Sequence, residues 1–264
     1  MRAAVLTSTM RRHCFVANRL ATRLNVVHVW QERKSFEPLR YAADAAEEAV
    51  IARHFAARDA SEAEFFAADD RVTAPCTCLP PGGCNDSAVV DAIRGVAPDL
   101  LLVFGTGLLQ AGLIDAFPDR IFNIHLGLSP YYRGAGTNFW PLVNGEPEYC
   151  GATIHYLDAG VDSGPIIAHV RPPMRAGDGP HDIGNRTIVA AAEALADAVV
   201  LRARGRLRGV PQANGGRLYR RKDFSAAAVE RLAANFRDGM IQAYLRDQPA
   251  RDAALSLVRM ELEA

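Results

Sequence analysis

The sequence has no long apolar run: none reaches the ~18 residues that a membrane-spanning helix requires. It also has no excess of either charge, because 30 Lys and Arg residues balance 30 Asp and Glu residues. A balanced chain offers no evident basic field for gripping nucleic acid. The basic stretch at 217–223 reads more simply as a solvated surface run. We therefore expect no membrane and no nucleic acid among the partners.

Export and metal-binding signals are also lacking. The first residues are too short in their apolar part for a signal peptide and instead predict a first strand. We therefore expect a cytoplasmic protein whose five cysteines are reduced. Cys76, Cys78 and Cys84 are spaced C-x-C-x5-C, whereas zinc sites usually use four ligands with C-x2-C spacing. With no fourth ligand nearby, we expect no metal.

Short apolar runs alternate with longer amphipathic stretches, a pattern typical of an α/β sheet protein. The continuous run at 98–109, broken by glycines, predicts a central strand that is buried on both faces and ends in a ligand loop. The full prediction places strands at 3–7, 26–30, 71–76, within 98–109, and at 120–125, 151–157 and 165–172, and helices at 12–24, 43–67, 88–96, partly at 137–145, at 181–205 and at 226–245.

The composition changes after residue 205, where a Gly- and Arg-rich connection begins. We expect a catalytic domain over 1–205 and a short, mainly helical C-terminal extension over 206–264. A small hairpin is expected around Gly215 and Gly216. A chain of 264 residues is long enough to bury a sizeable core in such an arrangement.

The segment FNIHLGLSPYYRGAG, residues 122–136, ends an expected strand in an amide and an imidazole. Asn123 and His125 are two residues apart, so both face the same side of the strand. Ligands of open α/β sheets sit outside the carboxyl ends of the strands, where this pair falls. Asp162, in a glycine-flanked loop between two later strands, is the best candidate for a third polar group.

An amide, an imidazole and a carboxylate suit acyl transfer to an amine. The amide can donate to a carbonyl oxygen as it becomes an oxyanion. The imidazole can donate to the same oxygen or accept a proton from the amine, and the carboxylate can orient the imidazole. No Ser or Cys nucleophile is needed if the amine attacks directly. Taken alone, however, Asn-x-His on a strand is more often structural than catalytic.

Two motifs in order, FNIHLGLSPYYRGAG and GATIHYLDAGVDSGPII, resemble the folate-dependent formyltransferase family. That family includes glycinamide ribonucleotide, methionyl-tRNA and amino-sugar formyltransferases. The match covers residues 98–172 closely and the N-terminal sheet loosely. The resemblance implies a Rossmann-like formyltransferase fold, a mostly parallel sheet with helices on both faces, although the chain has no G-x-G-x-x-G. That absence argues against a dinucleotide oxidoreductase.

The resemblance also implies roles for individual residues. Asn123, His125 and Asp162 match the catalytic residues, and His155 matches a family histidine that could support Asp162. The co-substrate is 10-formyltetrahydrofolate. Its pterin is expected between two loops, which consist of Gly105, Thr106, Gly107, Leu108 and Leu109 on one side and Leu157, Asp158, Ala159, Gly160 and Val161 on the other.

The acceptor amine stays open at the level of sequence. Arg11, Arg12 and His13 begin a helix and form an anion-site candidate, although surface arginines are as simple an explanation. Tyr131, Tyr132 and Arg133 are the other candidate acceptor contacts. We favour an amino sugar carried on a nucleotide. The alternative acceptors are hydroxyornithine, glycinamide ribonucleotide and water, the last of which would make the protein a formyltetrahydrofolate hydrolase. The non-enzyme alternative is a metabolite-binding module. A homodimer is compatible with the sequence.

Overall fold

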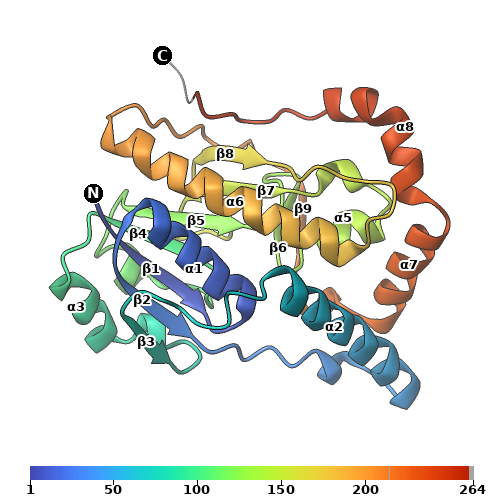
Figure 1. Cartoon of the computed structure of the whole chain (residues 1–264), viewed down its shortest axis with the longest axis horizontal. Helices are drawn as coiled ribbons and strands as arrows, with labels where there is room; N and C mark the ends of the chain where they lie inside the picture. The colour runs from blue at the N-terminus through green and yellow to red at the C-terminus, as the bar shows by residue number, and fades with distance from the viewer. Residues whose placement is uncertain (214, 262–264) are drawn as a thin grey trace.

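A seven-stranded sheet forms the centre of the computed structural model, which describes residues 1–213 and 215–261 (Figure 1). Its strand order is β3-β2-β1-β4-β5-β7-β8. The strands from β3 to β5 pair in parallel, and β7 is antiparallel to both of its neighbours. The bounds are β1 (Arg2–Ser8), β2 (Asn25–Glu32), β3 (Cys76–Leu79), β4 (Leu100–Phe104), β5 (Ile121–His125), β7 (Ala152–Tyr156) and β8 (Ile166–Val170).

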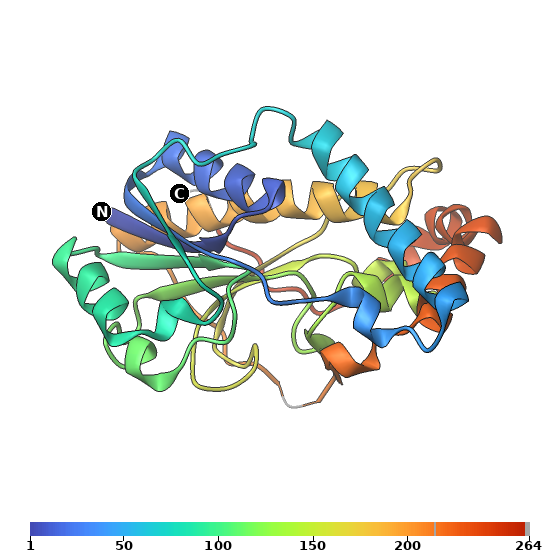
Figure 2. The ribbon, with the colours of Figure 1, turned by 90° about the horizontal axis from the view of Figure 1, so that it is seen from below.

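Helices cover both faces of this sheet (Figure 2). On one face lie α1 (Arg11–Arg23) and α6 (Pro180–Ala203), and on the other lie α3 (Ser87–Gly95) and α4 (Ala111–Ile114). Each face has its own apolar core: Leu20 and Leu195 belong to the first, Ile93 and Leu113 to the second. The mostly parallel sheet between two helical layers confirms the predicted fold class.

The period-two pattern of the strands explains how one sheet serves two cores. In β1, Ala3 and Val5 pack into the α1/α6 core, while Ala4 and Leu6 pack into the α3/α4 core. All five residues of β4 are buried, as expected of a central strand covered on both faces. This strand ends at Phe104, and the predicted glycine-containing loop follows.

Two expected elements are placed or divided differently. The edge strand β3 spans Cys76–Leu79 and not 71–76, because Val72 and Ala74 pack against the α1/α6 core without pairing in the sheet. The helix expected over 226–245 is two helices, α7 (Ala226–Arg237) and α8 (Met240–Ala253). Gly239 lies between them with φ of 80°, a left-handed conformation that interrupts a right-handed helix.

The C-terminal extension joins the main body through a second, two-stranded sheet. In it β9 (Arg217–Tyr219) pairs in parallel with β6 (Tyr132–Gly134), so the hairpin expected around Gly215 and Gly216 is wrong. Gly216 instead has φ of 77°, and a Cβ there would lie 1.6 Å from the carbonyl oxygen of Pro130. The domain boundary at residue 205 stays a prediction; α6 ends at Ala203.

Side-chain packing also attaches the C-terminal extension to the main body. A third core contains Tyr132, Trp140, Leu232 and Ile241, and so joins β6 to α5 (Phe139–Val143), α7 and α8. Beyond α8 the chain returns to β8, where the amide of His169 donates to the carbonyl of Val258 over 2.8 Å. The amide of Val258 in turn donates to Nδ1 of His169 over 2.9 Å.

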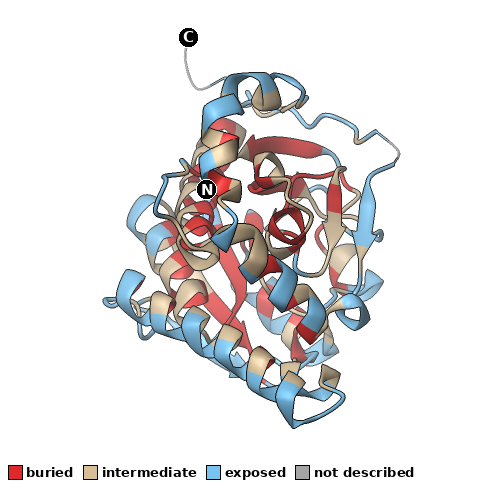
Figure 3. Ribbon diagram, turned by 90° about the vertical axis from the view of Figure 1, so that its right-hand side faces the viewer, coloured by how far each residue is buried: buried red, intermediate tan, exposed pale blue. Residues whose placement is uncertain are grey.

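Burial is concentrated in the strands and in the helix surfaces that face them (Figure 3). The long helix α2 (Ala45–Phe65) differs, since only Ile51 and Glu62 of its residues are buried. Asp44 caps it by accepting hydrogen bonds from the amides of Ala46 and Glu47.

Short 3-10 turns occupy Pro38–Tyr41 (η1), Gly83–Asn85 (η2), Pro147–Tyr149 (η3) and Arg221–Asp223 (η4). Within residues 1–213 and 215–261, each helix is too short or too polar to cross a membrane.

Candidate active site

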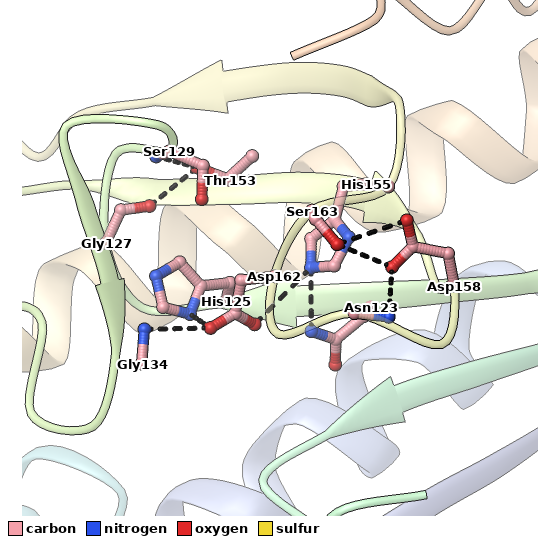
Figure 4. A network of polar contacts seen from close by, with 12 residues as sticks. Asn123, His125, Gly127, Ser129, Gly134, Thr153, His155, Asp158, Asp162 and Ser163 are labelled. Atoms are coloured by element: carbon pink, nitrogen blue, oxygen red, sulfur yellow. Dashed lines mark hydrogen bonds and ion pairs between the residues drawn. The ribbon is translucent and has the colours of Figure 1, made fainter. Parts of the chain in front are cut away.

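Asn123, His125 and Asp162 meet at β5, as the sequence predicts (Figure 4). The Nδ1 atom of His125 lies 3.2 Å from Oδ2 of Asp162. Because β7 runs antiparallel to β5, the loop that carries Asp162 starts beside the amino end of β5, where the Leu157 amide donates to the Ile121 carbonyl. The loop then doubles back to reach His125 near the other end of the strand.

The position of Asp162 is held by several contacts. The amide of Gly134 donates to Oδ2 over 3.0 Å, and the side-chain amide of Gln212 donates to the carbonyl of Asp162 over 2.9 Å. Asp162 has φ of 49°, a left-handed conformation that costs a non-glycine residue roughly 1–3 kcal/mol. Strain of this kind persists where surrounding structure imposes it, and it is common at functional sites.

His155 holds the amide of Asn123 in place. Its Nδ1 lies 2.8 Å from the carbonyl oxygen of Tyr156, which can only accept, so Nδ1 carries the proton. Burial lowers the pKa of His155, so the ring is neutral near pH 7 and Nε2 is an acceptor. The side-chain nitrogen of Asn123 donates to that Nε2 over 3.0 Å. Asp162, the partner suggested by resemblance, is farther, at 3.8 Å.

The ring of His125 is fixed on both sides. Its Nε2 donates to the carbonyl of Tyr132 over 3.0 Å, while Nδ1 faces Asp162. Both ring nitrogens therefore face oxygen atoms, one of the backbone and one of a carboxylate. Gly127 leaves room for the imidazole, since a Cβ at this position would lie 2.6 Å from Nε2.

The two loops expected to border a pterin flank the same face of the sheet. Leu109 of one and Leu157 of the other both pack against the α3/α4 core. Their tips present apolar side chains to solvent, with Leu108 79% exposed and Val161 44% exposed. Exposed apolar side chains on loops at one face of the sheet are suited to contact a flat, largely apolar ligand.

Sequence reasoning missed Glu32, which braces the first of these loops. Its carboxylate is buried at the end of β2, where Oε1 accepts from the amide of Gly107 over 2.8 Å and Oε2 from the amide of Cys84 over 3.2 Å. The only signal in the sequence was an acidic residue at the end of an apolar strand. A buried carboxylate requires such donors, and here the donors are loop amides.

The basic residues predicted at the start of α1 point in different directions. Arg12 forms an ion pair with Glu62 of α2, and Arg11 is directed toward the carbonyl of Ala67. His13 is buried against Phe104, and burial lowers the pKa of its imidazole well below the usual value. Of the three, only Arg12 lines the large cavity described below.

Of the second predicted acceptor group, residues 131–133, Tyr132 is the one whose polar group is used within the fold. The buried hydroxyl of Tyr132 contacts Glu146, Arg217 and the side-chain amide of Asn144, which leaves no accessible polar group on this side chain for an acceptor. Tyr131 accepts through its hydroxyl from the amide of Ser256 over 2.9 Å. The Nε atom of Arg133 is buried, and no hydrogen-bond partner for it occurs among the described residues.

A cavity of about 680 Å³ lies between α2, α5, α6 and η4. Its wall includes Leu126, which follows His125 in the chain, and Ala135, which follows the Gly134 that binds Asp162. The cavity therefore reaches residues next to His125 and Gly134 in the chain, although the candidate catalytic residues Asn123, His125 and Asp162 do not line it. In the part of the chain that the structure describes, no three His, Cys, Asp or Glu side chains are grouped to hold a metal ion.

Comparison with known proteins identifies the family to which this chain belongs. Residues 5–199 match the formyl transferase family model, and this region contains the whole of the site around Asn123, His125 and Asp162. The chain belongs to the formyl transferase family. Its fold and its motif-bearing strands agree with that assignment.

Individual relatives carry different names. A methionyl-tRNA formyltransferase from Pelobacter propionicus is 34% identical over 135 residues, which cover 51% of this chain and 42% of that protein. The chain thus spans less than half the length of this curated relative. Glycinamide ribonucleotide transformylase 1 from Symbiobacterium toebii has TM-score 0.56 at 23% identity, over 80% of this chain and 94% of that one. A sugar N-formyltransferase from a Shewanella species has TM-score 0.55 at 16% identity, over 85% and 78%. These two structures share the fold.

Proposed function

We propose that this protein transfers a formyl group from 10-formyltetrahydrofolate to a primary amine of a small acceptor. The observation that carries the proposal is the convergence of Asn123, His125 and Asp162, with 3.2 Å between the imidazole and the carboxylate. Membership of the formyl transferase family supports the same reaction. The two loops that flank the α3/α4 face, with Leu108 and Val161 exposed, are suited to the pterin.

The site residues suit direct attack by the amine. The amine nitrogen forms a bond to the formyl carbon, the bond from that carbon to N10 of the folate breaks, and one proton passes from the amine to N10. Asn123 uses one N–H to bind His155, so its second N–H is available for the oxyanion. His125 and Asp162 form the acid–base pair that moves the proton.

The favoured acceptor is an amino sugar carried on a nucleotide. The cavity next to the catalytic group has a volume within the 300–1,000 Å³ range usual for small-molecule sites. Its wall combines aromatic rings with cationic side chains, which suits a ligand with both a flat ring and an anionic group. Methionyl-tRNA is the acceptor named for the curated relatives, and it therefore belongs in the test panel.

The test is turnover with 10-formyltetrahydrofolate and a panel of amines: nucleotide-linked amino sugars, glycinamide ribonucleotide, hydroxyornithine and methionyl-tRNA. Formylated products are identified by mass spectrometry. Asn123→Ala and His125→Ala should each lower kcat by roughly 10²–10⁴-fold while the melting temperature is retained.

Each other result points to a different class. Formate released without any acceptor identifies a hydrolase. Folate-independent ligand binding without turnover identifies a metabolite-binding module. Unchanged turnover in both variants contradicts the catalytic assignment.

A further inference from the structure

The C-terminal extension forms part of the wall of the cavity that Leu126 and Ala135 also line. Its wall contains Arg220, Arg221 and Phe224 from the η4 region, which lie beyond the region 5–199 that matches the family. Helix α2 also lines the cavity, through His54, Phe55 and Arg58, and Phe55 packs against Phe224 of the extension with 5.6 Å between the ring centroids. The extension therefore contributes side chains to this cavity in addition to those from the region that matches the family.

Three cationic side chains from distant parts of the chain meet at this cavity. They are Arg12 of α1, Lys34 after β2 and Arg221 of η4. Partial burial, together with the positive charges of Arg12 and Arg221, lowers the pKa of Lys34 to about 8. Like charges that line one cavity destabilise one another unless an anion lies between them.

The protein supplies few anions of its own here. Arg12 pairs with Glu62, whose carboxylate is also 3.7 Å from Arg58. Within residues 1–213 and 215–261, no carboxylate lies within 4 Å of the charged groups of Lys34 or Arg221. The lining cations, Arg12, Lys34, Arg58, Arg220 and Arg221, outnumber the lining acids, Asp59 and Glu62.

Aromatic rings lie beside these cations. Phe36, Phe55 and Phe224 pack around one another, with ring centroids separated by 5.6 to 6.5 Å, and Phe139 lies 5.6 Å from Phe224. The guanidinium carbon of Arg221 is 5.9 Å from the Phe36 ring. The cavity thus offers flat apolar surfaces directly next to unpaired positive charge.

We propose that Lys34, Arg12 and Arg221 bind a phosphate or diphosphate group of the acceptor, so that the C-terminal extension selects acceptors with this anion. This inference rests on the proposed formyl transfer, since it places the acceptor in the cavity. The aromatic rings then contact the planar part of the same molecule, in the manner of a nucleotide. Lys34 also donates to the carbonyl of Gly105, which leaves two of its three N–H groups for the anion.

The test measures binding separately from turnover. Calorimetry with UDP, dTDP and GDP, each compared with its nucleoside, probes the anion site directly. Arg221→Gln and Lys34→Gln should each weaken binding of the best nucleotide by about tenfold. Lys222→Gln is the matched control, because Lys222 is the exposed neighbour of Arg221 and does not line the cavity. It should change the affinity by less than about twofold.

Two results would overturn the anion site: no nucleotide binding by the folded wild type, or equal affinities in Arg221→Gln and Lys222→Gln. His125→Ala should keep nucleotide affinity while losing turnover. If the nucleotide pattern holds but formyl transfer is absent, the proposed reaction fails and the anion site stands. If a phosphate-bearing acceptor is formylated with kcat/KM unaffected by Arg221→Gln, the reaction stands and the anion site fails.

Discussion

The side-chain amide of Asn123 is held by Nε2 of His155 across 3.0 Å, and this contact determines which way the amide faces. The ring of His155 is itself fixed by the carbonyl of Tyr156 at 2.8 Å. The two residues pair across β5 and β7, so the contact follows from strand register. A framework of two hydrogen-bonded strands thereby sets the orientation of the group assigned to the oxyanion.

Replacement of His155 tests this orientation. His155→Phe removes the acceptor and should lower kcat by roughly 10–100-fold, with little change in KM for the amine, because a misaligned amide loses part of its stabilisation of the transition state. His155→Gln keeps an acceptor oxygen and should recover part of the rate. Steady-state kinetics of both variants measure the difference. Equal losses in kcat for Phe and Gln would show that the contact with Asn123 is not what matters.

Replacement of Asp162 tests the carboxylate. Asp162→Asn keeps an oxygen for the amide of Gly134 but loses the charge that faces His125, and kcat should fall by about 10²-fold or more. Binding of folate, followed by calorimetry, should change little, since the loop keeps its backbone contacts to Gln212. Retention of wild-type kcat in Asp162→Asn would rule out a proton-transfer or charge role for this residue.

Replacement of Glu32 tests the brace of the Gly105–Leu109 loop. Glu32→Ala leaves the amides of Gly107 and Cys84 without their acceptor, and the buried amide of Cys84 alone costs roughly 1–3 kcal/mol when unpaired. We expect weaker folate binding and a lower melting temperature, with KM for the amine unchanged. Glu32→Gln retains one acceptor oxygen and should lie between Ala and wild type. Unchanged folate affinity in Glu32→Ala would contradict the prediction that the Gly105–Leu109 loop contacts the folate.

Acid should destabilise the protein through His54. Burial, with the charges of His181 and Arg58, lowers the pKa of His54 from 6.5 to about 4. The unfolded chain therefore binds the proton more readily, and folding stability falls as pH drops below 6.5, until the loss levels off below about 4. The loss from this residue is roughly 1–2 kcal/mol between pH 7.5 and 5.5.

Denaturant unfolding of wild type and His54→Gln at these two pH values measures that contribution. Other buried histidines shift the same way, among them His13 and His169, so wild type should also lose stability from them. The informative quantity is the free energy of unfolding of wild type minus that of His54→Gln. This difference should be smaller at pH 5.5 than at pH 7.5. Parallel pH dependence in both would contradict a neutral His54 in the folded state.

Local patterns predicted the parts of the site that lie on neighbouring strands. Asn123 and His125 follow from period two within one strand, and Asp162 follows from a loop between two paired strands. Patterns could not predict the pairing of Tyr132 with Arg217, which are far apart in the chain and each in a strand of three residues.

The bracing role of Glu32 and the meeting of Lys34 with Arg221 were equally out of reach. Each depends on where loops lie in three dimensions, and neither carries a periodic signal. Tyr132 shows the reverse case: its place beside a motif suggested contact with a ligand, whereas tertiary packing buries its ring and uses its hydroxyl. Sequence spacing specifies the direction of a side chain within a strand, but not what covers it.

The return of the chain to β8 has a consequence for self-association. A strand at the rim of a sheet offers free N–H and C=O groups to any other strand of suitable shape. Here His169, next to the last residue of β8, exchanges backbone and ring hydrogen bonds with Val258 of the same chain. The segment around Val258 thus occupies hydrogen-bonding groups of β8 that a strand from a second molecule would otherwise use.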